Sequence, residues 1–100
     1  MSYNELELKI VRWAEARKII PNGKPHSQLL KAVSEIGELC DAEAKQDLAA
    51  VKDAVGDVLV CLINYCALKD ITMLECLRGA YNEIKDRKGH LTKEGIFIKE

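Results

Sequence analysis

The sequence has 100 residues, which is enough for one small domain and too few for two. Hydrophobic residues make up 48% and charged residues 31%, a mix that fits a folded chain and excludes a disordered one. The 15 Lys+Arg and 16 Asp+Glu give a formal net charge of −1, so no overall field attracts nucleic acid or an anionic membrane.

The N-terminal half holds signals for two helices. Ser2 and Glu5 have the spacing of a capping box, which predicts a helix that begins directly after Ser2. Residues 19–25 contain two prolines, an asparagine and a glycine, and they predict a loop. Ser27 is then a candidate N-cap for a second helix that ends near residue 44. The polar residues 2–5 are unlike a secretory signal, so we expect the chain in the cytoplasm.

The C-terminal half predicts two more helices and a tail. Asp47 is a candidate N-cap for a third helix that ends near residue 68. Its apolar run, residues 58–63, is too short for the roughly 20 residues of a membrane span. Thr72 and Glu75 form a second capping box, and Gly89 is a natural residue to end the fourth helix. Residues 90–100 predict an extended arm or a short strand.

Four helices with short connections predict an all-α fold, a four-helix bundle in a single domain over residues 1–100. The chain has four cysteines, and no two of them have the CxxC spacing of a zinc or redox motif. We expect all four to be reduced and to serve as small apolar residues. They are Cys40, Cys61, Cys66 and Cys76.

Acidic residues gather on the second and third predicted helices. Lys31, Glu35 and Glu38 have the i, i+4, i+7 spacing that places them on one helix face. Asp53 and Asp57 are spaced i, i+4 on the next helix. Carboxylates that converge from two facing helices are suited to a hard cation such as Mg²⁺ or Mn²⁺. The alternative is a solvated acidic face with ion pairs to neighbouring lysines.

The fourth predicted helix carries polar and basic residues close to its end. Asn82 and Lys85 lie one turn apart, and Arg87 and Lys88 follow. Cations in this position favour phosphate oxygens, and the alternative is that they complement the dipole at the helix C-terminus. Trp13 on the first helix has the spacing of a core residue. Asn64 lies in an apolar stretch, so its amide needs a partner in another helix or in a ligand.

These motifs resemble the MazG-like family of all-α nucleoside triphosphate pyrophosphohydrolases. Residues 34–39 (SEIGEL), 54–58 (AVGDV) and 81–89 (YNEIKDRKG) are similar to the family's three motifs. The resemblance implies a metal site of Glu35, Glu38 and Asp57, with Asp53 as a candidate fourth member. Ala54 stands where the family's second motif has a glutamate, so the metal site departs from the pattern at this position.

The resemblance also implies a reaction, the Mg²⁺-dependent cleavage of a nucleoside triphosphate between its α- and β-phosphates, with Mn²⁺ as a second possible metal. Glu35 or Glu38 would activate the attacking water, and Lys85 would neutralise charge on the leaving pyrophosphate. Family members form dimers or tetramers, so we expect a homo-oligomer. The rival hypothesis is a nucleotide-binding or purely structural helical oligomer that has lost turnover. The implied substrate-binding residues are Lys31, Asn82, Lys85, Arg87 and Trp13, whose ring would stack on the base.

Overall fold

The computed structural model describes all 100 residues. Four helices follow in order, α1 (Tyr3–Ala16), α2 (Pro25–Ala44), α3 (Leu48–Leu68) and α4 (Met73–Ile84). Two short antiparallel strands, β1 (Gly89–Leu91) and β2 (Phe97–Lys99), form a hairpin after them. The predicted all-α class with four helices is therefore confirmed. No helix combines the length and the apolar character needed to cross a membrane.

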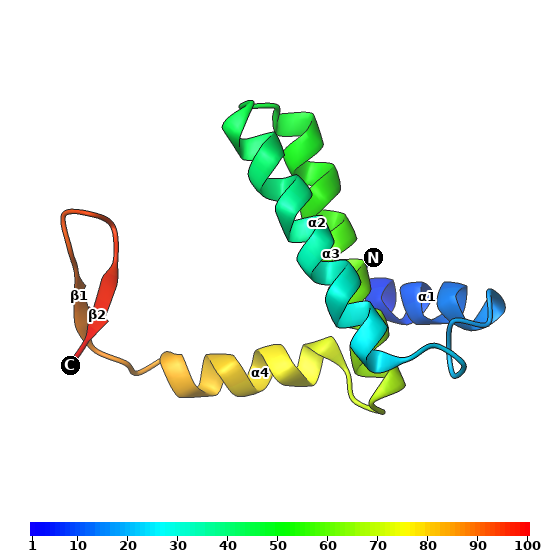
Figure 1. The fold of residues 1–100 in the computed structure, drawn as a ribbon. Coiled ribbons are helices and arrows are strands. Elements are labelled where there is room, and N and C mark those ends of the chain that lie inside the picture. The colour runs from blue at the N-terminus through cyan, green and yellow to red at the C-terminus, as the bar shows by residue number, and fades with distance from the viewer.

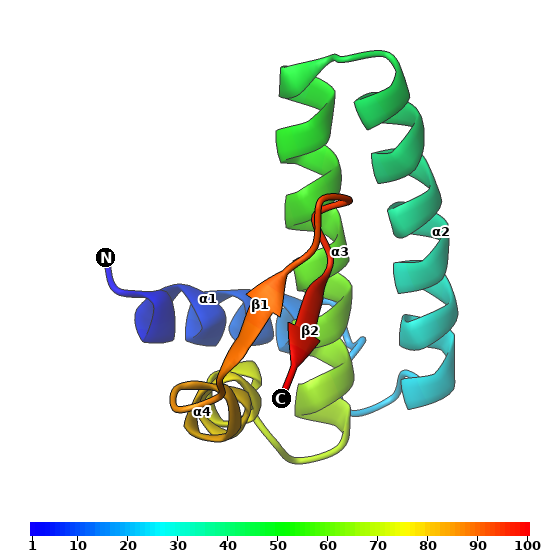
Figure 2. The same cartoon turned by 90° about the vertical axis from the view of Figure 1, so that its left-hand side faces the viewer.

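The helices α2 and α3 pair side by side in opposite directions and form a long hairpin (Figure 1). At the base of this hairpin α1 and α4 leave toward opposite sides. The strands stand at the far end of α4, away from α2 and α3 (Figure 1), and they therefore lie in front of α3 in the view turned by 90° (Figure 2). Within one chain, α2 and α3 therefore form a closely packed pair, and α1 and α4 project from it as two arms.

Three of the four predicted N-caps are confirmed. The Ser2 hydroxyl accepts a hydrogen bond from the Glu5 backbone at 3.1 Å. The Asp47 carboxylate accepts from the Ala50 backbone, also at 3.1 Å. A complete capping box is present only at Thr72, whose hydroxyl and backbone both bond to residue 75. Local polar side chains thus set three helix starts, because each satisfies a free backbone N–H.

The start of α2 differs from the prediction. The helix begins at Pro25, with Lys24 as its N-cap residue, and Ser27 lies inside the first turn. Proline is favoured in the first turn of a helix because its fixed φ suits the helix and its missing N–H would be unpaired there anyway. The two residues before Ser27 therefore already take helical conformation.

The end of α4 also differs from the prediction, because the helix stops at Ile84, five residues before Gly89. Gly89 instead begins β1 and pairs with Lys99. A Cβ atom at Gly89 would collide with the Ile98 carbonyl and the Phe97 ring. The glycine is thus needed for the close approach of the two strands. Because α4 ends early, Arg87 and Lys88 lie outside any helix.

The hydrophobic core of the single chain is small. Only ten residues are buried, most of them small, and no large side chain is fully buried. The radius of gyration is 16.1 Å, against about 13 Å for a compact chain of 100 residues. A cluster at the base of the hairpin joins three helices, with Ile10 and Val11 from α1 packed against it. Its buried members are Ile63, Cys66 and Met73.

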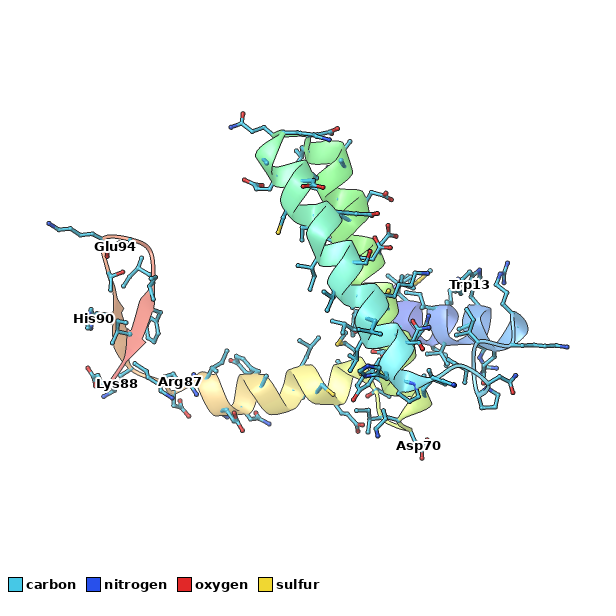
Figure 3. The ribbon with its side chains drawn as sticks, viewed as in Figure 1. Trp13, Asp70, Arg87, Lys88, His90 and Glu94 are labelled. Carbon is cyan, nitrogen blue, oxygen red and sulfur yellow. The ribbon has the colours of Figure 1, made fainter.

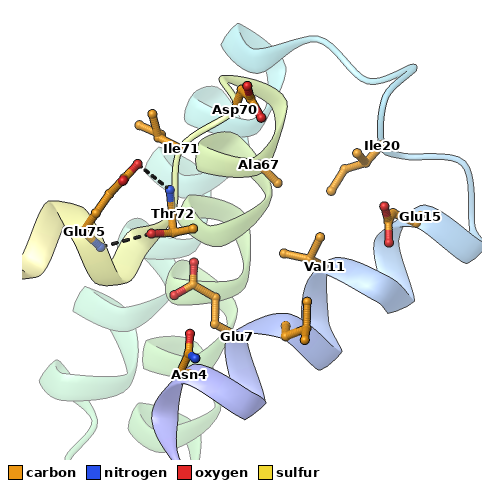
Figure 4. A pocket seen from close by; sticks show the side chains of 11 residues that line it. Asn4, Glu7, Val11, Glu15, Ile20, Ala67, Asp70, Ile71, Thr72 and Glu75 are labelled. Atoms are coloured by element: carbon orange, nitrogen blue, oxygen red, sulfur yellow. Dashed lines mark hydrogen bonds between the residues drawn. The ribbon is translucent and has the colours of Figure 1, made fainter.

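The carboxylate of Glu7 ties α1 to the start of α4. Its two oxygens accept hydrogen bonds from the backbone N–H groups of Met73 at 2.7 Å and Leu74 at 3.1 Å. Partial burial and a hydrogen bond to Glu7 raise the pKa of Tyr3 to about 12. Figure 4 shows Glu7 at this junction, in a cavity of about 500 Å³ whose wall also holds the acidic residues Glu15, Asp70 and Glu75. A negative charge at a helix N-terminus is stabilising, so this contact fixes the origin of α4.

Candidate functional site: a carboxylate cluster on the helical hairpin

The hairpin of α2 and α3 brings acidic residues to the same level. Glu35 lies nine residues before the end of α2, and Asp57 lies nine residues after the start of α3. Glu38 lies six residues before the end of α2, at the level of Ala54 on α3. The two helices are antiparallel neighbours with the same rise per residue. Residues at equal distances from the turn therefore lie at the same level along the hairpin. The antiparallel pairing therefore brings Glu35, Glu38 and Asp57 to neighbouring levels of the hairpin.

Glu35 occupies the centre of this cluster. Its Oε2 atom is buried and has no hydrogen-bond partner. A hydrogen bond to Glu38, partial desolvation and the negative charges of Glu38 and Asp57 raise the pKa of Glu35. The ammonium of Lys31 acts on Glu35 in the opposite direction, which places Lys31 within reach of the same group. Crowded carboxylates of this kind are costly unless a cation neutralises them.

The donor atoms fit a hard divalent cation. Mg²⁺ and Mn²⁺ prefer carboxylate oxygens, and the unpartnered Oε2 of Glu35 is such an oxygen. Within the single chain, no three His, Cys, Asp or Glu side chains converge closely enough to form a ready-made metal cluster. Glu35, Glu38 and Asp57 thus supply the right chemistry, and their side chains must turn toward a common ion to ligate it.

Asp53, the other acidic residue of α3, lies apart from this cluster. Asp53 is exposed, and its charge is not among those that shift the pKa of Glu35. Ala54, which is only 5% exposed, takes the position level with Glu38. Asp53 is rotated about 100° around the helix from that position, which explains why it does not replace a carboxylate there.

The basic group of α4 does not reach the carboxylates in one chain. Asn82 and Lys85 lie on the distal, exposed part of α4 and directly after it. Figure 3 shows Arg87 and Lys88 at the far end of α4, remote from the hairpin of α2 and α3. The structure therefore separates the predicted substrate-binding residues of α4 from the predicted metal ligands.

Trp13 lies on the opposite side of the molecule from Arg87 (Figure 3). It is 45% exposed, so it is not the core residue that its spacing suggested. The Arg17 guanidinium stacks on its ring, 4.6 Å from the centroid. The ring also borders a hollow of about 290 Å³ with Val60, which lies one helix turn beyond Asp57. An aromatic surface is thus available near the carboxylate cluster, although one part of it is shared with Arg17.

Two further polar residues lie in this region. Asp41 was not predicted as functional, whereas Asn64 was expected to have a partner either in another helix or in a ligand. Asp41 lies one turn beyond Glu38 and lines with it a hollow of about 280 Å³ at the turn between α2 and α3. The i, i+3 spacing of the two acids was the available signal. Asn64 is 3% exposed, and its Oδ1 atom has no hydrogen-bond partner. The protein partner expected for its carbonyl oxygen is therefore absent within the single chain.

Comparison with known families agrees with this geometry. Residues 24–92 match the family described as the MazG nucleotide pyrophosphohydrolase domain. The matched stretch is more than half of the chain and contains α2, α3, α4 and β1, with all of the clustered carboxylates. This chain belongs to the MazG nucleotide pyrophosphohydrolase family.

Two phage proteins are similar to this chain. An uncharacterised 18.2 kDa protein from the rep–hol intergenic region of Haemophilus phage HP1 (strain HP1c1) is 36% identical over 59 residues. The match covers 59% of this chain and 36% of that protein, so the chain spans about a third of its relative. The structure of a cyanophage S-2L MazG-like pyrophosphohydrolase, bound to dGDP and three catalytic Mn²⁺ ions per active site, matches with a TM-score of 0.72. It is 23% identical, with 100% of this chain and 94% of that chain covered, which shows a shared fold.

Proposed function

We propose that this protein is a nucleoside triphosphate pyrophosphohydrolase that uses Mg²⁺ or Mn²⁺ and cleaves between the α- and β-phosphates. The observation that carries the proposal is the cluster of Glu35, Glu38 and Asp57, in which a buried carboxylate oxygen of Glu35 has no donor. A structural carboxylate would have its oxygens satisfied by protein groups. We place the protein in the cytoplasm, where nucleotides and Mg²⁺ are abundant.

The residues of the hairpin have distinct parts in this proposal. Glu35, Glu38 and Asp57 would hold the metal, which lowers the pKa of a bound water and polarises phosphate oxygens. Lys31, whose charge already reaches Glu35, would neutralise charge on the substrate from the same face of α2. The carboxylate of Glu38 would orient the attacking water. Trp13 would contribute its free ring surface to the nucleobase.

A pyrophosphate-release assay tests the proposal directly. The cyanophage relative binds dGDP with Mn²⁺, so a panel of deoxynucleoside triphosphates with either Mg²⁺ or Mn²⁺ is the natural starting point. We expect equimolar nucleoside monophosphate and pyrophosphate, and no product when EDTA is present. Nucleotide binding without release would instead support a binding protein that lost turnover because residue 54 is alanine. A protein that neither binds nucleotides nor releases pyrophosphate would support the hypothesis of a purely structural oligomer.

We further propose that the active unit is a homo-oligomer, at least a dimer and more specifically a tetramer. A single chain exposes large apolar side chains on every helix, including the stripe of Leu77, Tyr81 and Ile84 on α4. A Cβ atom at Gly37 would meet nothing within 4 Å, so the face beside Glu38 is open to a second helix. Obligate interfaces bury roughly 2,000 Å² or more of mostly apolar surface. A second copy would supply that cover.

Such an assembly would also complete the site. Lys85 and Asn82 stand away from the carboxylates of their own chain, so we propose that they serve the carboxylates of a second copy. Subunit mixing tests this: Glu38→Gln and Lys85→Ala chains, each inactive alone, are unfolded and refolded together. Random pairing should restore about a quarter of wild-type activity, because half of the dimers carry one intact site of two.

A matched control identifies the source of any recovery. Mixing Glu35→Gln with Glu38→Gln removes two groups of the same half-site and should restore no activity. Light scattering on the wild type gives the mass of the assembly. A monodisperse monomer with full activity would overturn both the assembly and the shared site, while leaving the proposed reaction intact.

A further inference from the structure

Two cysteines meet where α4 joins α3. Cys66, on the last turns of α3, is 5% exposed and packs in the cluster that also contains Met73. The connection turns back over this residue, since the Cys66 carbonyl accepts a hydrogen bond from the Ile71 backbone at 2.9 Å. Cys76 lies three residues after Met73, hence on a neighbouring position of the same face of α4. The fold therefore sets the first turn of α4 against Cys66.

The two thiols are neighbours and differ in access. Cys76 lies one helix turn after Met73, which packs in the same cluster as Cys66. Burial, followed by the proximity of Cys76, raises the pKa of Cys66 to about 11, so Cys66 is a protonated thiol at neutral pH. Cys76 is exposed to solvent. An oxidant therefore meets Cys76 first, with the buried thiol of Cys66 behind it.

We propose that Cys66 and Cys76 form a reversible disulfide that locks α4 onto α3 under oxidising conditions. With a peroxide as oxidant, the Cys76 sulfur attacks one peroxide oxygen, the O–O bond breaks, and Cys76 becomes a sulfenic acid as water leaves. The Cys66 sulfur then attacks the Cys76 sulfur, the S–O bond breaks, and a second water leaves. The two thiols lose two electrons and two protons in total, and the peroxide accepts them. A dithiol reductant reverses the step by thiol–disulfide exchange.

The position gives this bond a conformational effect. From Glu75 to Ile84 every residue of α4 is exposed in the single chain, so the rest of its own chain holds α4 only at the first turn. The noncovalent attachments there are the burial of Met73 and the two hydrogen bonds to Glu7. A covalent bond at Cys76 adds a third attachment that local opening cannot break. The direction of the whole arm would then be fixed with respect to the hairpin.

Peptide mapping of the full-length protein tests the proposal. Purified protein is treated with hydrogen peroxide, alkylated and digested with trypsin, which cuts after Lys52, Lys69 and Arg78. We expect a cross-link between peptides 53–69 and 70–78, with intramolecular origin shown by an unchanged mass on non-reducing gels. Amide exchange in the first turn of α4 should slow by about tenfold on oxidation and recover with dithiothreitol.

Serine variants assign the cross-link. Cys66→Ser and Cys76→Ser should each abolish it, and because Cys76 is exposed its variant keeps the fold even if the buried Cys66→Ser does not. Cys61→Ser distinguishes the two cysteines of peptide 53–69 and should leave the cross-link intact, as should Cys40→Ser at an exposed position of α2. Oxidation that stops at a sulfenic or sulfinic acid on Cys76, or that joins Cys76 only to another chain, would overturn the proposal.

Discussion

Two carboxylates of this protein have opposite hydrogen-bonding environments. Glu7, at the junction of α1 and α4, is 5% exposed, and both of its oxygens accept backbone hydrogen bonds. Glu35, on the hairpin of α2 and α3, has a buried oxygen with no donor and two further carboxylates beside it. At the junction the Glu7 carboxylate binds the N-terminus of α4. On the hairpin, by contrast, the carboxylates gather negative charge that the chain itself does not neutralise.

This difference separates a structural acid from a functional one. A carboxylate at a helix N-terminus is stabilised by the dipole and by charge-assisted hydrogen bonds. A carboxylate that lies beside other carboxylates and keeps an unpaired buried oxygen destabilises the fold until an ion binds. Substitutions in the two regions should therefore have opposite effects on stability and activity.

The largest expected effect is on activity at the hairpin. Glu38→Gln removes a negative ligand and keeps the shape of the side chain, so metal-dependent turnover should fall by more than the roughly 10- to 100-fold seen when outer-shell partners of metal ligands are removed. Helical circular dichroism should not change. The matched control is Glu43→Gln, which removes an exposed acid from the same helix. Wild-type turnover in Glu38→Gln would exclude this residue from the site.

At the junction, the expected effect is on stability. Glu7→Gln places an amide N–H against one of two backbone donors, so the free energy of unfolding should fall by about 2 kcal/mol. Urea denaturation of the wild type and the variant measures this difference. Glu15→Gln, at an exposed position near the other end of α1, should have almost no effect. An equal loss in both variants would mean that Glu7 acts only through the charge of α1.

Glu35 should behave in the opposite way to Glu7 when metal is absent. Its folded-state pKa lies above its ordinary value of 4.5, so the native state binds this proton more tightly than the unfolded state does. The stabilisation from protonated Glu35 is fully present below pH 4.5 and is lost as pH rises through the folded-state pKa. In EDTA, Glu35→Gln should therefore unfold at a higher temperature than wild type at pH 7.5, and the difference should vanish near pH 4.

The same unfolding temperatures are then measured with metal added. Mn²⁺ should raise the unfolding temperature of the wild type, because a ligand that binds only the native state stabilises it. The same addition should leave Glu35→Gln nearly unchanged. A wild type that is more stable than Glu35→Gln in EDTA at pH 7.5 would contradict the comparison, since Glu35 would then be a stabilising acid like Glu7.

The local part of this fold could be predicted from the sequence, because it depends on neighbouring residues. Ser2, Asp47 and Thr72 each cap a helix through a side chain that bonds three residues ahead. The start of α2 was misjudged because Pro25 competes with Ser27, and both are good helix-start residues. The end of α4 was misjudged because Gly89 is needed by a strand partner ten residues further along the chain.

For the candidate site, too, the sequence predicted what depends on local spacing and missed what depends on distant contacts. The i, i+3 and i, i+4 spacings predicted one shared face for Lys31, Glu35 and Glu38, and the charges of Lys31, Glu38 and Asp57 all act on Glu35. The role of Glu7 depends on a contact with residues 66 positions away, which no local pattern reveals. Its place on the same stripe as Ile10 and Ala14 was the only available signal, since an acid on an apolar stripe needs a specific partner.

The smallest expected effect concerns Ala54, which is level with Glu38 and 5% exposed. Ala54→Glu would add a fourth carboxylate on the side of the cluster that α3 now leaves apolar. The Mg²⁺ concentration for half-maximal rate should fall several-fold, because affinity for hard cations rises with the number of charged ligands. The larger side chain also strains the contact between α2 and α3, so the variant should be somewhat less stable without metal. Asp53→Asn, which changes an exposed neighbour, should alter neither quantity. An unchanged Mg²⁺ requirement in a folded Ala54→Glu would show that the metal site ends at Glu35, Glu38 and Asp57.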